Sequence, residues 1–450
     1  MILSNLNLIR LGEVASFRNG LNFNKSSNGA KIKIIGVSNF GNRFVPDYDE
    51  LDEIIVDGEL SNEDFLKDGD IVFVRSNGNK ALVGRSLFIT QNSNISFSGF
   101  CIRARIENEH LYPKYFAYFT KTNQFKKSIS KGAIGTNINN LNQGILRDVV
   151  VPAPLLKKQK QIAKVLSDLD AKIEVNNKIN QELEALAKTI YDYWFVQFDF
   201  PYVTSSGVEK PYKSSGGKME YNEELKREIP EGWEGCKLGD VIEGTRTGLN
   251  PRQNFALGEG DNFYVTIKNI KQGRVVLDDK CDKISDESLE IINKRSDLKV
   301  GDILYTSIEP VGTTYLLRSE PENWNINESV FTVRPDFKKV SSEFLYMFLS
   351  GDYIKAYTKN VSAGSIHKGV RHSTLKDCKF ILPVKSIVDD FTKKVSPILD
   401  KLEVIQKENQ KLAALRDWLL PMLMNGQVTV GEAKEQLGMV AEDNGKYGDI

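Results

Sequence analysis

Histidine and cysteine are scarce in this chain, which has three histidines and four cysteines among 450 residues. The cysteines are widely separated and none forms a C-x-x-C pair, so neither a zinc site nor a disulfide framework is expected. No run of about 18 apolar residues occurs, which excludes a transmembrane helix, and the first ten residues do not resemble a signal peptide. These absences predict a cytoplasmic protein with reduced cysteines and no bound metal.

Motifs that carry catalysis are also missing. The sequence has no G-x-x-x-x-G-K-[ST] phosphate loop and no Pro-Pro pair, which the Asn/Asp-Pro-Pro-aromatic motif of amino-methyltransferases requires. Lysine plus arginine and aspartate plus glutamate both number 60, so the formal net charge is zero and any basic surface must be local. We therefore expect a protein that is not an enzyme and binds no cofactor directly.

A long tandem repeat is the strongest feature that is present. The segment LGEV at Leu11–Val14 recurs as LGDV at Leu238–Val241, and LKDGDI at Leu66–Ile71 recurs as LKVGDI at Leu298–Ile303. Gly20-Leu21-Asn22 likewise recurs as Gly248-Leu249-Asn250. The offset stays between 227 and 232 residues, so the pattern indicates a duplication of one large unit and not a short solenoid repeat.

Each repeat ends in a long helical pattern. From Gln159 to Trp194 there is no proline or glycine, and apolar residues alternate by four and three. A similar stripe runs from Val388 to Leu419, and at the repeat offset Asn180 corresponds to Asn409 within the two seams. Heptad spacing of this kind predicts coiled-coil helices, and a seam asparagine sets their register. Two unrelated amphipathic helices on separate cores are the alternative.

Strand-like runs and turn signals fill the region before each helix. The predicted fold class is α+β, with two tandem mixed α/β domains, each followed by a long helix, and the two helices packed as an antiparallel coiled coil. The predicted boundaries are residues 1–153 for the first domain, 154–196 for its helix, 197–230 for a linker, 231–384 for the second domain, 385–424 for its helix and 425–450 for a C-terminal tail. The linker is either flexible or an ordered strap.

Two basic stretches occupy corresponding places in the repeats. Nine basic residues lie between Leu111 and Lys160 against one acid, among them Lys126, Lys127 and Lys131. Seven lie between Tyr353 and Val388, again against one acid. Local basic patches on a neutral protein are what binding to a phosphate backbone requires. A basic, solvated helix is the alternative for either patch alone, whereas the acidic stretch Asp47–Asp70 is expected to be a solvated face.

Polar loops beside these patches hold candidate base-reading residues. Arginine pairs with guanine, and asparagine or glutamine with adenine, through bidentate hydrogen bonds in the major groove. Turn formation is the competing explanation for any single asparagine. The first domain offers Arg75, Ser76, Asn77, Asn79, Lys80, Arg85, Asn137, Asn139 and Asn140, and the second offers Arg246, Thr247, Asn250, Arg252, Ser365, His367, Lys368 and Arg371.

The arrangement resembles the specificity subunits of type I restriction–modification systems. The likeness extends over nearly the whole chain and is most specific in the linker with IPEGW at Ile229–Trp233, the helix from Ile162 to Trp194 and the ending LPMLMNGQ at Leu420–Gln427. The first domain lacks the IPEGW segment and begins directly near Leu8. Apolar seams and the aromatic residues Trp194, Phe195 and Trp418 are expected to be exposed where partners dock.

The resemblance implies that the two α/β domains are target-recognition domains of a subunit that recognises a bipartite, asymmetric double-stranded DNA target. It also implies two methyltransferase subunits docked on the helices and restriction subunits that join them, with S-adenosylmethionine, ATP and magnesium bound by these partners. A DNA-recognition subunit of a type IIB-like or solitary methylation system is the nearest alternative. A coiled-coil scaffold that never contacts DNA is a third.

Overall fold

The chain forms two compact units. The computed structural model describes residues 7–22, 30–41, 43–56, 60–92, 94–131, 140–204, 207–271, 273–278, 280–363 and 369–445. Unit 1 comprises Met1–Asn176 with Glu408–Ile450, and unit 2 comprises Asn177–Lys407. Each unit therefore contains one mixed α/β head, which we call head 1 or head 2, together with one half of each long helix.

Head 1 is built from three small sheets. Their strand orders are β2-β8-β5-β6, β4-β3-β7 and β1-β9, and β3 with β7 forms the parallel pair. Three helices lie between β8 and β9 in the chain, α1 Pro113–Phe119, α2 Asn123–Lys131 and α3 Gln143–Arg147. The strands are β1 Asn7–Arg10, β2 Ala15–Asn19, β3 Ala30–Ile35, β4 Asp52–Val56, β5 Ile71–Val74, β6 Ser86–Phe88, β7 Ile95–Phe97, β8 Cys101–Ile106 and β9 Val150–Ala153.

Head 2 has the same topology. Its sheets are ordered β15-β23-β20-β21, β19-β16-β22 and β14-β24, and β16 with β22 is again the parallel pair. It adds helix α5 Asp286–Ser296 and a small hairpin, β17 Ile270–Lys271 with β18 Arg274–Val275, while α6 Ser342–Ser350, α7 Asp352–Ala363 and α8 His372–Lys376 match the helices of head 1. The other strands are β14 Glu234–Lys237, β15 Ile242–Thr247, β16 Asn262–Val265, β19 Asp282–Ile284, β20 Ile303–Thr306, β21 Thr314–Leu316, β22 Trp324–Ile326, β23 Val330–Pro335 and β24 Lys379–Leu382.

The repeated LKxGDI segment forms one tight turn in both heads. The Asp70 carboxylate accepts a hydrogen bond of 2.7 Å from the backbone N–H of Lys67, and Asp302 accepts one of 2.9 Å from that of Lys299. The glycine before each aspartate has a φ of +88° or +91°, a left-handed conformation that favours glycine. The motif therefore recurs because each turn delivers a buried strand, β5 or β20, into its sheet.

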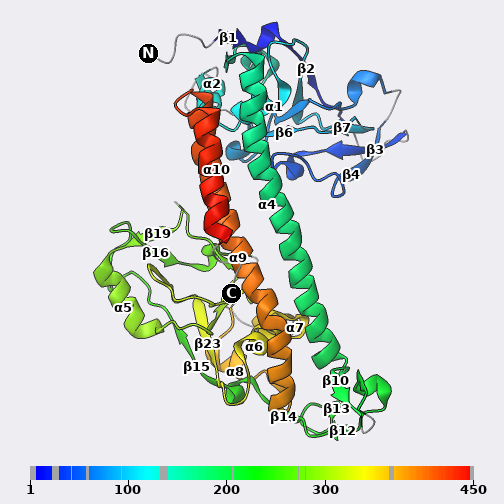
Figure 1. Cartoon of the computed structure of the whole chain (residues 1–450), viewed down its shortest axis with the longest axis vertical. Helices are drawn as coiled ribbons and strands as arrows, with labels where there is room; N and C mark the ends of the chain where they lie inside the picture. Colours follow the sequence, from blue (N-terminus) through cyan, green and yellow to red (C-terminus); the bar gives the residue numbers. More distant parts are fainter. Residues whose placement is uncertain are drawn as a thin grey trace. The chain divides into compact units, whose positions relative to one another are not determined.

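Within unit 1, the beginning of α4 Leu156–Tyr191 packs against the end of α9 Lys385–Met424, so the two helices run antiparallel (Figure 1). Ile162, Leu166 and Leu169 share a buried cluster with Leu412 and Leu419. The aromatic helix α1 belongs to the same cluster, which joins head 1 to the helix pair. Helix α10, Val430–Gly445, adds the buried Ala433 and gives order to most of the predicted tail.

Within unit 2, the end of α4 packs against the beginning of α9 through aromatic side chains. The ring of Phe195 lies 5.0 Å from that of Phe391 and 4.6 Å from that of Phe344 on α6, centroid to centroid. Trp194 and Phe195, on a π-helical turn that follows α4, are buried. The expectation that these two residues are exposed is therefore wrong, whereas Trp418 is 46% exposed.

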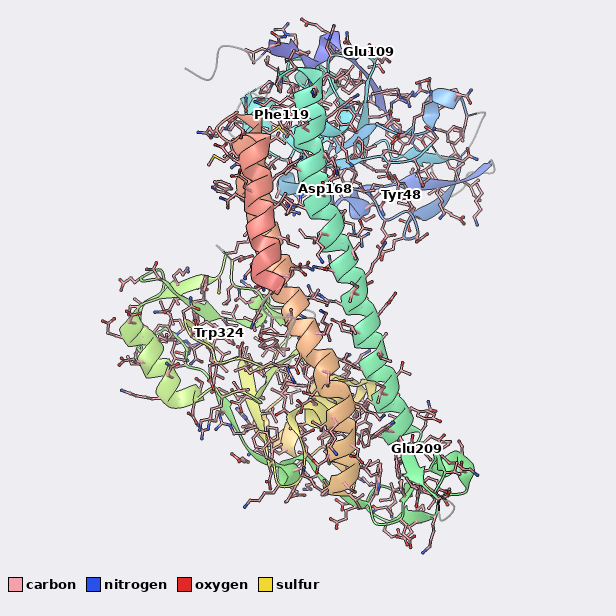
Figure 2. The ribbon with its side chains drawn as sticks, in the orientation of Figure 1. Tyr48, Glu109, Phe119, Asp168, Glu209 and Trp324 are labelled. Atoms are coloured by element: carbon pink, nitrogen blue, oxygen red, sulfur yellow. The ribbon has the colours of Figure 1, made fainter. Side chains whose placement is uncertain are left out.

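The segment between α4 and head 2 is ordered in its described parts, residues 197–204 and 207–230. It forms two hairpins, β10 Pro201–Val203 with β11 Glu209–Pro211 and β12 Met219–Asn222 with β13 Arg227–Pro230. Glu209 marks the first hairpin in Figure 2, where Trp324 marks strand β22 of head 2. The rings of Phe200, Tyr212 and Trp233 stack on one another, so the segment is a packed strap.

Candidate nucleic-acid interface

Four loops meet at one end of head 1. The backbone N–H of Arg75 donates to the carbonyl of Phe100 at 2.7 Å, and the N–H of Leu141 donates to the carbonyl of Arg75 at 2.8 Å. The N–H of Gly99 donates to the carbonyl of Leu21 at 2.7 Å, and Ser76 forms a β-bridge with Asn140. We call Leu21–Asn22, Arg75–Asn79, Ser98–Phe100 and Asn140–Leu141 loop cluster 1. These bonds bring together loops that lie far apart in the sequence.

Head 2 repeats three of these four backbone connections. The N–H of Ser307 donates to the carbonyl of Ser329 at 2.9 Å, and the N–H of Val370 donates to the carbonyl of Ser307 at 2.8 Å. A β-bridge joins Ile308 to Gly369. Loop cluster 2 comprises Leu249–Asn250, Ser307–Ile308, Asn327–Ser329 and Gly369–Val370. The two clusters therefore share a backbone design and differ in most of their side chains.

The glycine of the repeated Gly-Leu-Asn motif is required by close backbone contact. A Cβ on Gly20 would lie 2.2 Å from the carbonyl oxygen of Phe97. A Cβ on Gly248 would lie 1.6 Å from the carbonyl oxygen of Ile326. Any larger residue would push the first loop away from its neighbours, so the motif recurs as part of the cluster's construction.

The predicted base-reading residues of head 1 differ in what their side chains do. The side-chain oxygen of Asn77 accepts the N–H of Asn79 at 2.7 Å, and that of Asn79 accepts the N–H of Ala81 at 3.1 Å. Both asparagines therefore form the turn itself, as the alternative explanation holds. Arg75, Ser76 and Asn140 lie in loop cluster 1, whereas Arg85 donates to the carbonyl of Gly41 at 2.8 Å.

In head 2, Arg246 is occupied by an ion pair with Asp297 on the edge of the sheet. Its counterpart Arg18 pairs with Asp64 in the same way. Thr247 ends strand β15, and the side-chain amide of Asn254 donates to the carbonyl of Asn250 at 2.9 Å. The remaining described candidates are exposed, Arg252 after the Gly-Leu-Asn motif and Arg371 as the residue that precedes α8.

Several predicted residues lie outside the description that the structure gives. Asn137, Asn139, Ser365, His367 and Lys368 fall outside the described residues. For Lys80 and Lys131 the description covers the backbone only: Lys80 begins a 3-10 turn and Lys131 ends α2. DNA contact by these seven residues therefore stays a prediction from the sequence.

The acidic stretch before β5 has a structural role that the sequence did not predict. Asp64 and Asp70 are buried, and the Asp70 carboxylate forms a two-pronged ion pair with Arg105, with N···O distances of 2.7 and 2.8 Å. Arg334 and Asp302 repeat this pair in head 2 at the same distances. Hydrogen bonding to Asp302 raises the pKa of Arg334. The expectation of a wholly solvated acidic face is therefore wrong for these two aspartates.

A short basic helix follows the aromatic helix in each head. In α2, Phe125 and Ile129 are buried while Lys126 and Lys127 are exposed. In α7, Ile354 and Thr358 are buried while Lys355 and Lys359 are exposed. Each helix thus turns two lysines to solvent, as contact with a phosphate backbone would require.

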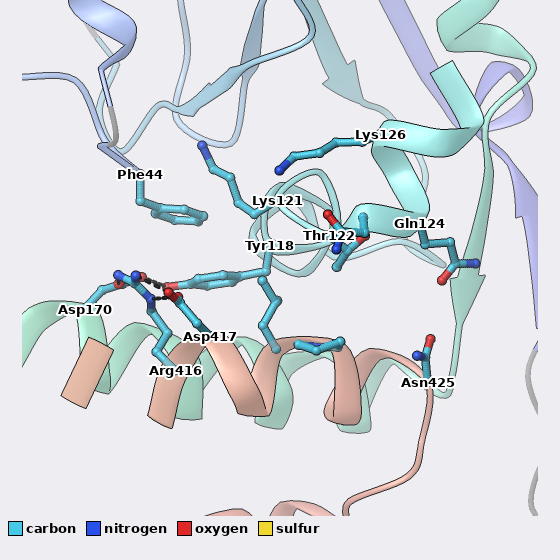
Figure 3. Close-up of a pocket in the computed structure, with 13 residues that line it drawn as sticks. Phe44, Tyr118, Lys121, Thr122, Gln124, Lys126, Asp170, Arg416, Asp417 and Asn425 are labelled. Atoms are coloured by element: carbon cyan, nitrogen blue, oxygen red, sulfur yellow. Dashed lines mark hydrogen bonds and ion pairs between the residues drawn. The ribbon is translucent and has the colours of Figure 1, made fainter. Parts of the chain in front are cut away.

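A partly buried polar contact beside a pocket of about 520 Å³ holds head 1 against the helix pair (Figure 3). The phenol of Tyr118 donates to Asp170 of α4 at 2.7 Å, and Arg416 of α9 donates to the other carboxylate oxygen at 2.9 Å. The ring of Phe44 stacks on that of Tyr118 at 4.2 Å. Lys121 lines the same pocket and donates to the carbonyl of Ser86 at 2.5 Å, and burial lowers its pKa to about 8.

Within the described residues, no group of three or more histidine, cysteine, aspartate or glutamate side chains is placed to hold a metal ion. In the same part of the chain, no helix has both the length and the apolar character needed to cross a membrane. What the described residues do offer is two loop clusters and two basic helices, which are features of a nucleic-acid-binding protein.

A family model for the type I restriction modification DNA specificity domain matches residues 4–185 and 230–416. The two matches together cover most of the chain and contain one repeat each, so the chain belongs to this family of DNA-specificity proteins. The fold predicted from the sequence, two tandem recognition domains with long antiparallel helices, is confirmed.

Curated relatives and a solved structure agree with this assignment. The chain is 26% identical to the specificity subunit of the MjaIX type I restriction enzyme of Methanocaldococcus jannaschii, over 76% of this chain and 75% of that protein. It is 25% identical to the HindI specificity subunit of Haemophilus influenzae, over 81% and 87% of the two chains. The crystal structure of a type I S subunit from M. genitalium superposes with a TM-score of 0.55 at 15% identity, over 94% of this chain and 97% of that one, which supports the fold.

Proposed function

We propose that this chain recognises a bipartite, asymmetric DNA target and that each head reads one half of it. The observation that carries the proposal is the loop cluster, which is built twice on one topology but with different side chains. Ser76, Phe100 and Asn140 of head 1 stand where head 2 has Ile308, Ser329 and Gly369. Because base edges are distinguished by side-chain chemistry, two such clusters would select two different half-sites.

The basic helices α2 and α7 supply the part of binding that does not depend on sequence. Lys126 and Lys127 in head 1, with Lys355 and Lys359 in head 2, would contact phosphates and release counterions. Phosphate contacts position a protein on the duplex, whereas the loop clusters would decide which duplex is chosen. This division explains how a chain of zero net charge binds DNA through local patches.

The chain supplies specificity, and partner subunits supply the chemistry. By membership in the family, two methyltransferase subunits dock on the helices and restriction subunits join them in the complete system. S-adenosylmethionine, ATP and magnesium would be bound by those partners and not by this chain. The continuous helices α4 and α9 would set the length of the unread spacer between the half-sites. The protein would act in the cytoplasm, where its DNA substrate and partners are found.

Mapping of methylated sites tests the proposal. The chain is produced together with the methyltransferase subunit encoded beside it, in a host without adenine methylation, and N6-methyladenine is located by single-molecule sequencing. A single split motif that is absent without this chain is the expected result. A stable complex that methylates no motif, or one uninterrupted motif, would contradict it.

A further inference from the structure

Phe100 is the most exposed large aromatic side chain in the part of the chain that the structure describes, at 62%. It lies in loop cluster 1, on the turn between β7 and β8. Isolated apolar residues are common on protein surfaces, so exposure alone carries no conclusion. Its position among the polar residues of a predicted base-reading surface is the informative feature.

The turn that presents Phe100 is held rigidly. Its carbonyl accepts the N–H of Arg75 at 2.7 Å, and the N–H of Cys101 donates to the carbonyl of Ser98 at 2.8 Å. A Cβ on the preceding Gly99 would lie 2.1 Å from the side-chain oxygen of Asn22 and 3.3 Å from the carbonyl oxygen of Leu21, so a larger residue there would have to displace the Asn22 side chain. The phenyl ring is therefore presented to solvent from a turn whose backbone is hydrogen-bonded to two neighbouring loops, at Arg75 and at Leu21.

The chemistry of a phenyl ring limits what it recognises on DNA. It neither donates nor accepts a conventional hydrogen bond, and the one apolar feature on a major-groove base edge is the C5-methyl group of thymine. In the same loop cluster, Asn22, Ser76 and Asn140 carry hydrogen-bonding side chains that could serve other bases. The equivalent position in head 2 is Ser329, whose carbonyl accepts the N–H of Ser307 as that of Phe100 accepts the N–H of Arg75.

We propose that Phe100 is a specificity-determining residue that contacts the C5-methyl group of a thymine in the half-site read by head 1. This inference rests on the proposed function, because it requires head 1 to face DNA. It predicts that the apolar contact exists in one half of the target only, since head 2 carries a serine at the equivalent position.

A methylation map of the Phe100→Ser variant tests this directly. The complete complex with its methyltransferase subunit is used, and Phe337→Ser is the control. Phe337 is 52% exposed in head 2. It follows the last residue of β23, whereas Ser329 directly precedes the first, so the two residues lie at opposite ends of this strand. The expected result is that one thymine position in one half-site becomes degenerate in Phe100→Ser, while the control keeps the whole motif. An unchanged motif in Phe100→Ser overturns the inference.

Replacement of thymine by uracil isolates the methyl group. Binding of the same purified complex is compared on the target duplex with thymine and with uracil at the implicated position. The wild-type complex is expected to bind the uracil duplex about fourfold more weakly, and Phe100→Ser is expected to bind both equally. Equal binding by the wild type, or a uniform loss on every duplex in the variant, contradicts the contact. Failure of the proposed function would instead show as the absence of any motif that depends on this chain.

Discussion

Asn176 of α4 and Asn409 of α9 form a buried amide–amide hydrogen bond across the helix seam, with an Nδ2···Oδ1 distance of 2.9 Å. Asn176 also donates to Glu408 at 2.8 Å. The repeat aligns Asn409 with Asn180, yet the position that corresponds to Asn176 is Ile405. The second repeat therefore cannot form an equivalent amide–amide bond. Because a seam asparagine fixes the register of paired helices, this bond sets the register of α4 and α9 in unit 1.

Loss of one amide from this pair should cost stability. Replacing Asn409 by leucine leaves the buried Asn176 without its acceptor there, and the free energy of unfolding is expected to fall by about 1–3 kcal/mol. The double leucine variant should recover most of that loss, because neither buried amide remains. Denaturant unfolding of the wild type, Asn176→Leu, Asn409→Leu and the double variant forms a double-mutant cycle. Gln181→Leu, at an exposed position of α4, is the matched control and should change little.

The contact between Tyr118 and Asp170 should anchor head 1 on α4. Tyr118→Phe removes one hydrogen bond to a carboxylate, and the expected loss is about 1.5–3 kcal/mol of unfolding free energy. Tyr221→Phe, at an exposed position of the strap, should have no effect. Hydrogen exchange of α1 and α4 should speed up in Tyr118→Phe alone. Equal stability of the two variants would show that the phenol contributes nothing.

Lys121 should make stability depend on pH. Burial lowers the pKa of Lys121 to about 8, below the value for an unfolded lysine, so the unfolded chain binds this proton more tightly. The free-energy cost of burying the protonated Lys121 amine is full below pH 8, and it is relieved as the pH rises from about 8 towards 10. The stability of wild type relative to Lys121→Met should therefore improve between pH 7 and 9.5. Lys126→Met, at an exposed position on α2, should show no such change relative to wild type.

The lysines of α2 should control the salt dependence of DNA binding. Changing Lys126 and Lys127 to glutamine removes up to two phosphate contacts, so the slope of log K against log salt should fall by about 2. Affinity should weaken to a similar degree on every DNA sequence, because phosphate contacts carry no base information. Lys31→Gln, on strand β3 of the same head, is the control. An unchanged slope would exclude α2 from the interface.

The two domains and the two long helices were predictable because repeated segments and periodic apolar residues encode them. The LKxGDI turns and the helix seams are local patterns, and their second copies confirm them. The loop clusters were predicted only in part. Arg75 and Asn140 belong to loops far apart in the sequence, and only the backbone hydrogen bonds and the β-bridge of the folded domain bring these loops together. Phe100 carries no motif of its own, so only its exposure in the folded cluster identifies it.

The sequence also misassigned some charged and aromatic residues for a physical reason. Asp64 and Asp70 look like part of a solvated acidic run in the sequence. Their arginine partners come from strands β2 and β8, so the sequence near the two aspartates does not reveal them. Trp194 and Phe195 look like interface residues, but α6 and α9 of the same chain cover them. In each case the deciding neighbour lies dozens or hundreds of residues away.

Exchange of one head is the most direct test of the account. Residues 231–384 are replaced by the corresponding segment of another family member, and the methylated motif is mapped in the complete complex. If each head reads one half-site, one half of the motif changes and the other half remains as in the wild type. A change in both halves, with the complex intact, would contradict the claim that the two heads read DNA independently.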